Sequence, residues 1–169
     1  PLGMIDVSNG SEHAEIIKNT LRNMEEVGPD WWTGYSYSWM GNLYARAREG
    51  ENAAEALRDF ATCFTLPNSF HVNGDQSGTG KSKFTYRPFT LEGNFAAAAG
   101  IQEMLIQSYS GVVLLLPAAP PGWGDLEFHN LRAEGAFLVS LKRELGKNTE
   151  VTILAEKGGT LKLANPFDG

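Results

Sequence analysis

Hydrophobic positions recur with helical spacing over the first two thirds of the chain. In residues 11–27, Ile17 and Leu21 fall on one face while charged residues fill the other, which is typical of an amphipathic helix. Gly28-Pro29 ends this helix. The pattern predicts four helices in all, over residues 11–27, about 33–48, 51–66 and about 93–109.

From residue 110 onward the period changes from helical to extended. Phe137, Val139 and Leu141 alternate with polar neighbours, which indicates half-buried antiparallel strands. The chain is therefore expected to be an α + β protein whose two parts are separate in sequence. Strands are predicted over residues 112–116, 137–141, 151–154 and 160–163, with a Pro- and Gly-rich connection at 117–124 and a turn at 157–159.

A long polar segment interrupts the helical part. Residues 68–86 are rich in Gly, Ser, Asn and Lys, and so long a loop in a compact domain is usually a functional loop or a disordered insertion. Residues 75–82 (DQSGTGKS) end like a phosphate-binding loop, but Asp75 stands where that motif needs its first glycine. The strand before is too short and no helix pattern follows, so nucleotide binding is not expected.

Composition excludes several classes of partner. The formal net charge is −6, and the scattered basic residues form no stripe for nucleic acid or an anionic membrane. The longest apolar run, residues 112–116, is far too short to span a bilayer. We therefore expect neither a nucleic-acid nor a membrane partner, and residues 1–3 look like the remnant of a cleaved tag.

Cysteine and histidine give no sign of a metal site. Cys63 lies between two phenylalanines in a helical pattern and is expected to be a small buried hydrophobe. His13, His71 and His129 lie far apart, without the spacing of helical metal ligands. No metal and no cofactor is expected.

Aromatic residues crowd the start of the second predicted helix. Such a cluster is explained either by helix–helix core packing, which average burial favours, or by a platform for sugar rings, whose C–H faces pack on indole and phenol rings. The residues alone leave both interpretations open. The six are Trp31, Trp32, Tyr35, Tyr37, Trp39 and Tyr44.

Glu92 is the candidate catalytic residue. It precedes Gly93 at the first turn of a mostly apolar helix that contains four consecutive alanines. One interpretation is an acidic residue stabilised by the helix dipole. The other is a carboxylate that positions or deprotonates water in a cleft, as inverting glycosidases require.

Two motifs give the chain a resemblance to glycoside hydrolase family 95. Residues 33–46 (TGYSYSWMGNLYAR) resemble that family's Thr-Gly-Trp-Ser-x-Ala-Trp-Lys-x-Asn-x-Trp-Ala-Arg segment, and residues 87–95 (RPFTLEGNF) resemble its Pro-Pro-Phe-Gln-Ile-Asp-Gly-Asn-Phe. Shorter matches follow in the same order at residues 100–108, 115–118, 131–137 and 165–166. The resemblance covers nearly the whole chain after the first few residues.

The resemblance implies a fold and a chemistry. Residues 4–110, with an inserted loop at 71–86, would be the last helices of an (α/α)6 toroid, and residues 111–169 a C-terminal antiparallel β domain. The activity implied is inverting hydrolysis by an α-L-fucosidase-type enzyme. By position Glu92 would be the water-positioning carboxylate, while the general acid would lie in an upstream catalytic portion. Substrate contacts would come from Trp39, Tyr35, Trp32 and Asn94.

Partners and location follow from the same resemblance. The implied partners are an oligosaccharide or glycan and the upstream catalytic portion, and the implied location is extracellular or periplasmic. Helices removed from a closed toroid would expose apolar surface, so the isolated chain is expected to self-associate or to have rearranged helices. A non-catalytic carbohydrate-binding or interaction module is the alternative hypothesis.

Departures from the family pattern bear on activity. Glu92 replaces aspartate, and the extra methylene moves a water-positioning oxygen by about 1 Å, which can cost ~100-fold in rate. Met40 stands where the family usually has lysine, and the loop from His71 to Phe84 is longer than the family's link. These changes predict an altered substrate or a lost activity.

Overall fold

The computed structural model describes residues 3–167, so the first two residues of the expected tag remnant lie outside the described range. Four helices come first and two small antiparallel sheets follow, which confirms the predicted α + β class. The helices are α1 (Ser11–Val27), α2 (Gly34–Arg46), α3 (Gly50–Cys63) and α4 (Glu92–Leu105). The strands are β1 (Ile106–Gln107), β2 (Leu114–Leu115), β3 (Leu126–Ala133), β4 (Phe137–Glu144) and β5 (Lys147–Ala155).

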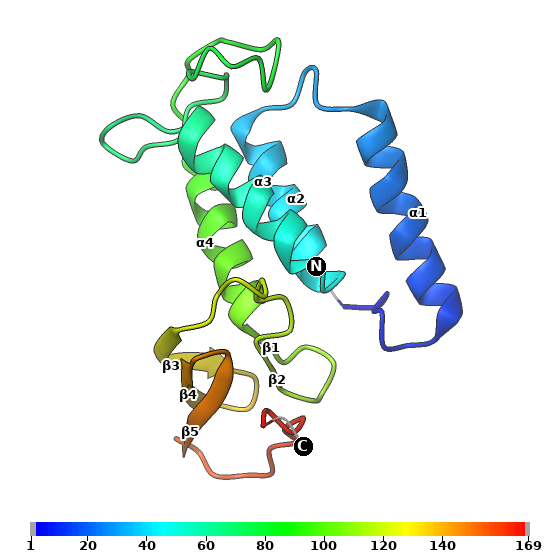
Figure 1. Cartoon of the computed structure of the whole chain (residues 1–169), viewed down its shortest axis with the longest axis vertical. Helices are drawn as coiled ribbons and strands as arrows, with labels where there is room; N and C mark the ends of the chain where they lie inside the picture. The colour runs from blue at the N-terminus through cyan, green and yellow to red at the C-terminus, as the bar shows by residue number, and fades with distance from the viewer. Residues whose placement is uncertain (1–2, 168–169) are drawn as a thin grey trace.

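Helices α2, α3 and α4 pack side by side, while α1 stands off to one side of them (Figure 1). The long loop after α3 lies at the end of the bundle where α2 and α4 begin, and the sheets lie at the other end. Small residues allow the close packing. A Cβ atom on Gly41 would lie 2.7 Å from the Leu57 side chain, and one on Gly100 would lie 3.1 Å from Asn42.

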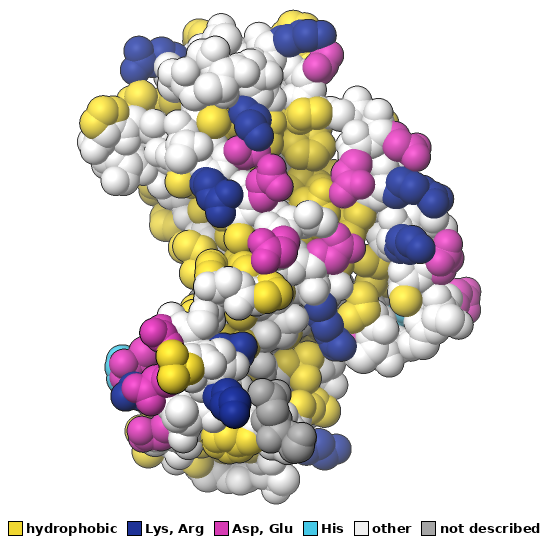
Figure 2. Space-filling model, viewed as in Figure 1, with side chains coloured by type: hydrophobic (Ala, Val, Ile, Leu, Met, Phe, Trp, Pro, Cys, Tyr) yellow, Lys and Arg dark blue, Asp and Glu magenta, His cyan; other side chains and the backbone are white. Residues whose placement is uncertain are grey.

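Helix α1 reaches the bundle through a few apolar side chains. Leu21 is buried in a core cluster with Met40 and Tyr44 of α2. The Tyr44 hydroxyl donates a hydrogen bond to Glu25 of α1 at 2.7 Å. In Figure 2 a band of apolar side chains remains visible between α1 and the other helices, bordered by carboxylates.

The β part has its own core. Phe137, Val139 and Leu141 are all buried, as their alternation predicted, and they pack with Phe128 of the neighbouring strand. Sheet order is β3-β4-β5, antiparallel throughout. The β4–β5 hairpin turns at Leu145-Gly146, both with positive φ, which matches the twist of a tight hairpin.

Several predicted boundaries in the β part were wrong. The fourth helix ends at Leu105 because Ile106 is extended and pairs with Leu115. Residues 160–163 form no strand, since only Leu163 bridges to Val113. The prediction also missed β3, whose alternation is interrupted where Asn130 adopts positive φ and the register shifts.

Candidate functional site

The candidate catalytic residue Glu92 occupies the first position of α4 and is exposed. An acidic side chain there is stabilised by the partial positive charge of the helix N-terminus. Gly93, the next residue, is buried, so one side of the first turn of α4 faces solvent and the other faces the protein interior. Glu92 therefore lies at the edge between solvent and the interior of the bundle.

Three contacts fix how α4 lies against α2. Ser38 Oγ donates to the Gly93 carbonyl at 3.0 Å, and Asn42 Nδ2 donates to the Ala96 carbonyl at 2.8 Å. One turn further along α2 and two turns further along α4, Arg46 pairs with Glu103 at 2.8 Å. The contacts advance together along both helices, so α2 and α4 run parallel and begin at the same end.

Helical spacing assigns the aromatic residues Tyr35 and Trp39 to the same open side of this pair as Glu92. Residues 35, 39 and 46 share one stripe of α2, and residues 92, 99 and 103 share one stripe of α4, by helical spacing. The Arg46–Glu103 ion pair joins the two stripes edge to edge. Tyr35 is 42% exposed and Trp39 is 45% exposed, so both rings are free to contact a ligand.

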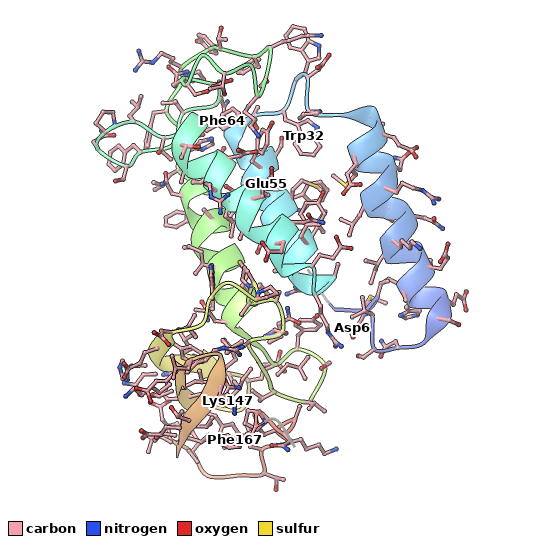
Figure 3. The ribbon with its side chains drawn as sticks, in the orientation of Figure 1. Asp6, Trp32, Glu55, Phe64, Lys147 and Phe167 are labelled. Atoms are coloured by element: carbon pink, nitrogen blue, oxygen red, sulfur yellow. The ribbon has the colours of Figure 1, made fainter. Side chains whose placement is uncertain are left out.

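Trp32 lies elsewhere. Its ring packs edge-on against Tyr37 at 5.4 Å between centroids, next to the core residues Phe60 and Phe64. Figure 3 shows Trp32 and Phe64 at the loop end of the bundle. The surrounding cavity of about 230 Å³ opens between α2 and α3, on the flank opposite Trp39; it is lined by Trp32, Tyr37, Met40, Tyr44, Asn52, Glu55, Ala56 and Asp59.

Asn94 is engaged by the protein backbone. Its Oδ1 accepts a hydrogen bond from the His71 amide at 2.9 Å, and its Nδ2 donates to the Ser69 carbonyl at 2.8 Å. Both partners belong to the long loop. By helical spacing Tyr35, Trp39 and Glu92 fall on one side of the α2–α4 pair, while Trp32 packs against core residues and Asn94 is bonded to the loop backbone.

Met40, which replaces the usual family lysine, is 1% exposed and lies in the core cluster with Tyr44 and Ala53. Its stripe on α2 faces α3 rather than the open side that carries Trp39. The substitution therefore removes a charge from a position that here is packed by apolar side chains.

The phosphate-loop resemblance has a clear structural explanation. Asp75 accepts hydrogen bonds from the backbone amides of Ser77 at 2.8 Å, Lys81 at 2.9 Å and Ser82 at 3.4 Å. Its own carboxylate thus occupies the position among the amides that a phosphate would need. Lys81 is turned to Asp59, with 2.7 Å between Nζ and Oδ2.

Sequence reasoning missed two features of the loop. His71 is buried between α2 and α4, and the exposed rings of Phe70 and Phe89 pack together at 5.1 Å. The sequence signal for the burial of His71 was the pair Gly34 and Gly93, two glycines at the starts of predicted helices. A Cβ atom on either one would lie within 2.4 Å of the His71 ring.

Residues 3–167 hold the single cysteine and the three histidines of the chain. Cys63 is buried, as predicted. No group of three or more His, Cys, Asp or Glu side chains in this range is arranged to hold a metal ion. No helix in it combines the length and apolar character needed to cross a bilayer.

Carboxylates and exposed aromatic rings are side chains that glycoside hydrolases use on sugars, and the helices here are followed by a small β domain. Residues 1–105 match the glycosyl hydrolase family 95 catalytic domain, and residues 107–167 match the glycoside hydrolase family 95 C-terminal domain. The chain belongs to glycoside hydrolase family 95.

A curated relative agrees with this assignment. Alpha-L-fucosidase 2 from Arabidopsis thaliana is 32% identical over 155 residues, which cover 90% of this chain and 18% of that protein. The chain thus spans less than a fifth of the relative's length and matches the family catalytic domain only in part.

Proposed function

We propose that this chain is the C-terminal part of an inverting glycoside hydrolase that releases a terminal fucose, or a related sugar, from a glycan. The proposal is supported by the common side of the α2–α4 pair that helical spacing gives Glu92, Tyr35 and Trp39, in a member of family 95. In this proposal residues 4–110 carry the site and residues 111–169 form the supporting β domain.

Each residue has a chemical role in the proposal. The Glu92 carboxylate accepts a hydrogen bond from the attacking water and draws off its proton as the glycosidic bond breaks. Tyr35 and Trp39 form an apolar wall against the C–H face of the sugar. The general acid comes from the upstream portion, at the roughly 6.5–9.5 Å separation that leaves room for water.

Trp32 and Asn94 support the site in this proposal without touching the sugar. Asn94 ties the long loop to the first turn of α4 through two hydrogen bonds to backbone groups. Trp32 packs the junction between the α1–α2 connection and α3. Their substitution is expected to act through the placement of Glu92.

Glu92→Gln in a protein that includes the upstream portion tests the proposal. Glutamine keeps the size and removes the base, so kcat should fall by ~10²–10⁴-fold with little change in KM. Hydrolysis of an aryl α-L-fucoside and of a fucosylated oligosaccharide provides the measurement.

Glu51→Gln is the matched control, since Glu51 is an exposed acid in the first turn of α3. It should retain the full rate. A Glu92→Gln enzyme that hydrolyses either substrate at the unmodified rate would rule out the assigned role. The 169-residue chain alone is expected to be inactive.

A carbohydrate-binding module without catalysis is the second candidate, because Tyr35 and Trp39 remain exposed in the chain by itself. Isothermal titration with fucosylated and galactosylated oligosaccharides separates the two. Millimolar or tighter binding that is lost in Trp39→Ala favours the module. Heat signals indistinguishable from dilution favour an incomplete active site.

A further inference from the structure

The long loop places His71 inside the helical bundle, next to the buried Val72. His71 is 0% exposed, and its ring lies 5.3 Å from that of Phe60, between centroids. A Cβ atom on Gly34 would come within 2.4 Å of Nε2, and one on Gly93 within 2.3 Å of Nδ1. Helices α2 and α4 therefore both begin directly against the imidazole.

Hydrogen bonds from His71 reach both sides of Glu92 in sequence. The His71 amide donates to Asn94 Oδ1 at 2.9 Å, and the His71 carbonyl accepts from the Thr90 amide at 3.2 Å. Its Nδ1 lies 2.8 Å from Thr90 Oγ1. Residues 90 and 94 bracket the first turn of α4, so His71 holds the backbone that carries Glu92.

The hydrogen-bond chain selects one tautomer of the ring. Thr90 Oγ1 donates its hydrogen to Asn73 Oδ1 at 3.2 Å, so His71 Nδ1 carries the proton and donates to Thr90. The lone pair of Nε2 is then buried, and within residues 3–167 it has no hydrogen-bond partner. A buried polar atom left unpaired is costly, whereas a phenyl ring of similar shape would pack there without that cost.

The negative charge of Glu92 interacts electrostatically with the imidazole of His71. Burial lowers the pKa of His71, while the negative charge of Glu92 and the Thr90 backbone raise it by less. The neighbours from α2, α3 and the loop are uncharged: Gly34, Phe60, Asn73 and Thr90. Ring and carboxylate are therefore coupled across the first turn of α4.

We propose that His71 is a positioning residue of this hydrolase site, which fixes the first turn of α4 through Thr90 and Asn94 and thereby sets the direction of the Glu92 carboxylate. The proposal rests on the role proposed above for Glu92. It gives the inserted loop a function: through His71 the loop acts on the site from the interior, in addition to forming its rim.

The first test leaves His71 intact and uses the 169-residue chain. NMR titration of the His71 ring is compared between the unmodified chain and Glu92→Gln, with Glu51→Gln as the control. Removal of the Glu92 charge should lower the His71 pKa further, and Glu51→Gln should leave it unchanged. An identical His71 titration in all three proteins would overturn the coupling.

The second test separates positioning from packing. His71→Asn keeps a donor near the position of Nδ1, whereas His71→Phe keeps the ring shape and removes both nitrogens. Amide hydrogen exchange of residues 91–95 should accelerate at least tenfold in His71→Phe and much less in His71→Asn, with α1 unaffected. Full protection in His71→Phe would mean that the ring only fills space. His129→Gln, at an exposed site, controls for loss of a histidine.

The outcomes distinguish this proposal from the one on which it rests. If Glu92→Gln in the longer protein leaves hydrolysis intact, the catalytic role fails even where the coupling in the isolated chain is observed. If Glu92→Gln abolishes hydrolysis while His71→Phe changes neither kcat nor amide exchange, only the positioning role fails.

Discussion

At the scale of single residues, two buried polar side chains hold the long loop in place. One is an imidazole with a nitrogen that is unpaired in the described part of the chain, and the other is a carboxylate that accepts hydrogen bonds from backbone amides. His71 is packed against the starts of two helices with one nitrogen unpaired among the described residues. Asp75 is 6% exposed and accepts hydrogen bonds from several loop amides. Neither residue belongs to a helix or strand, so their value to the fold comes from the backbone they hold.

Asp75→Asn should destabilise the chain by about 2 kcal/mol at pH 7, because bonds to a charged acceptor are stronger than those to a neutral amide. Burial raises the pKa of Asp75, but hydrogen bonds from Ser77, Ser82 and Lys81 lower it by more, to below 3.8. A lowered folded pKa stabilises the protein above pH 3.8, and this stability is lost as the pH falls through the folded value.

Thermal unfolding followed by circular dichroism provides the measurement. The difference in unfolding free energy between the two proteins should be constant from pH 5 to 7 and should shrink below pH 3.8. A difference that stays the same down to pH 3 would contradict the assigned hydrogen bonds to the ionised carboxylate.

At the scale of elements, the parallel pair α2 and α4 carries the residues of the proposed site, and its close approach depends on small residues. Ser38 and Asn42 of α2 donate to the carbonyls of Gly93 and Ala96, while Gly100 packs against Asn42 and Leu57. The small residues Ala96 and Gly100 of α4 allow this close approach of α2. The pair thus holds Glu92 and Trp39 on one rigid support.

Gly93→Ala should destabilise the protein by about 1–3 kcal/mol, because the new methyl group would overlap the His71 ring. The expected first effect is displacement of the loop from the start of α4. Chemical denaturation gives the free energy, and near-ultraviolet circular dichroism reports the aromatic packing.

Gly122→Ala is the matched control, since a Cβ atom there meets no atom within 4 Å. It should change stability by less than about 0.5 kcal/mol. Equal stability of the two variants would show that the first turn of α4 adapts freely, which contradicts the tight packing around His71.

At the scale of the whole molecule, the chain exposes apolar surface that a complete catalytic domain is expected to cover. Trp31 and Phe95 are 69% and 66% exposed. An apolar cavity of about 440 Å³ lies between α1 and α2, lined in part by Ile16, Ile17 and Leu43. Figure 2 shows apolar side chains along the α1 boundary. This surface is consistent with a chain that matches 18% of its relative's length.

The isolated chain should therefore self-associate as its concentration rises, since large exposed apolar patches favour contact between copies. Phe95→Lys should reduce the association, because it places a charge on the surface of α4. Leu145→Lys is the control: Leu145 is 91% exposed but lies in the β4–β5 turn, away from the helices. Multi-angle light scattering that finds a monomer at millimolar concentration would contradict this expectation.

The sequence by itself determined the order and type of most elements, the buried alternation of Phe137, Val139 and Leu141, the burial of Cys63 and the family. These properties follow from local periodicity and ordered motifs. The tertiary structure decided which aromatic residues of the cluster are core and which are exposed, because both kinds satisfy the same pattern. It alone showed that Tyr35 and Trp39 are exposed, whereas Trp32 packs against Tyr37 on the flank between α2 and α3.

Only the tertiary structure also revealed how the loop packs against the helices. A polar segment has no periodicity to report its partners, so the burial of His71 and the ring of amides around Asp75 left no pattern beyond isolated glycines. The same limit hid β3, where a bulge breaks the alternation. Periodicity tells which side of an element is buried, whereas the neighbour that buries it is chosen by contacts between residues distant in sequence.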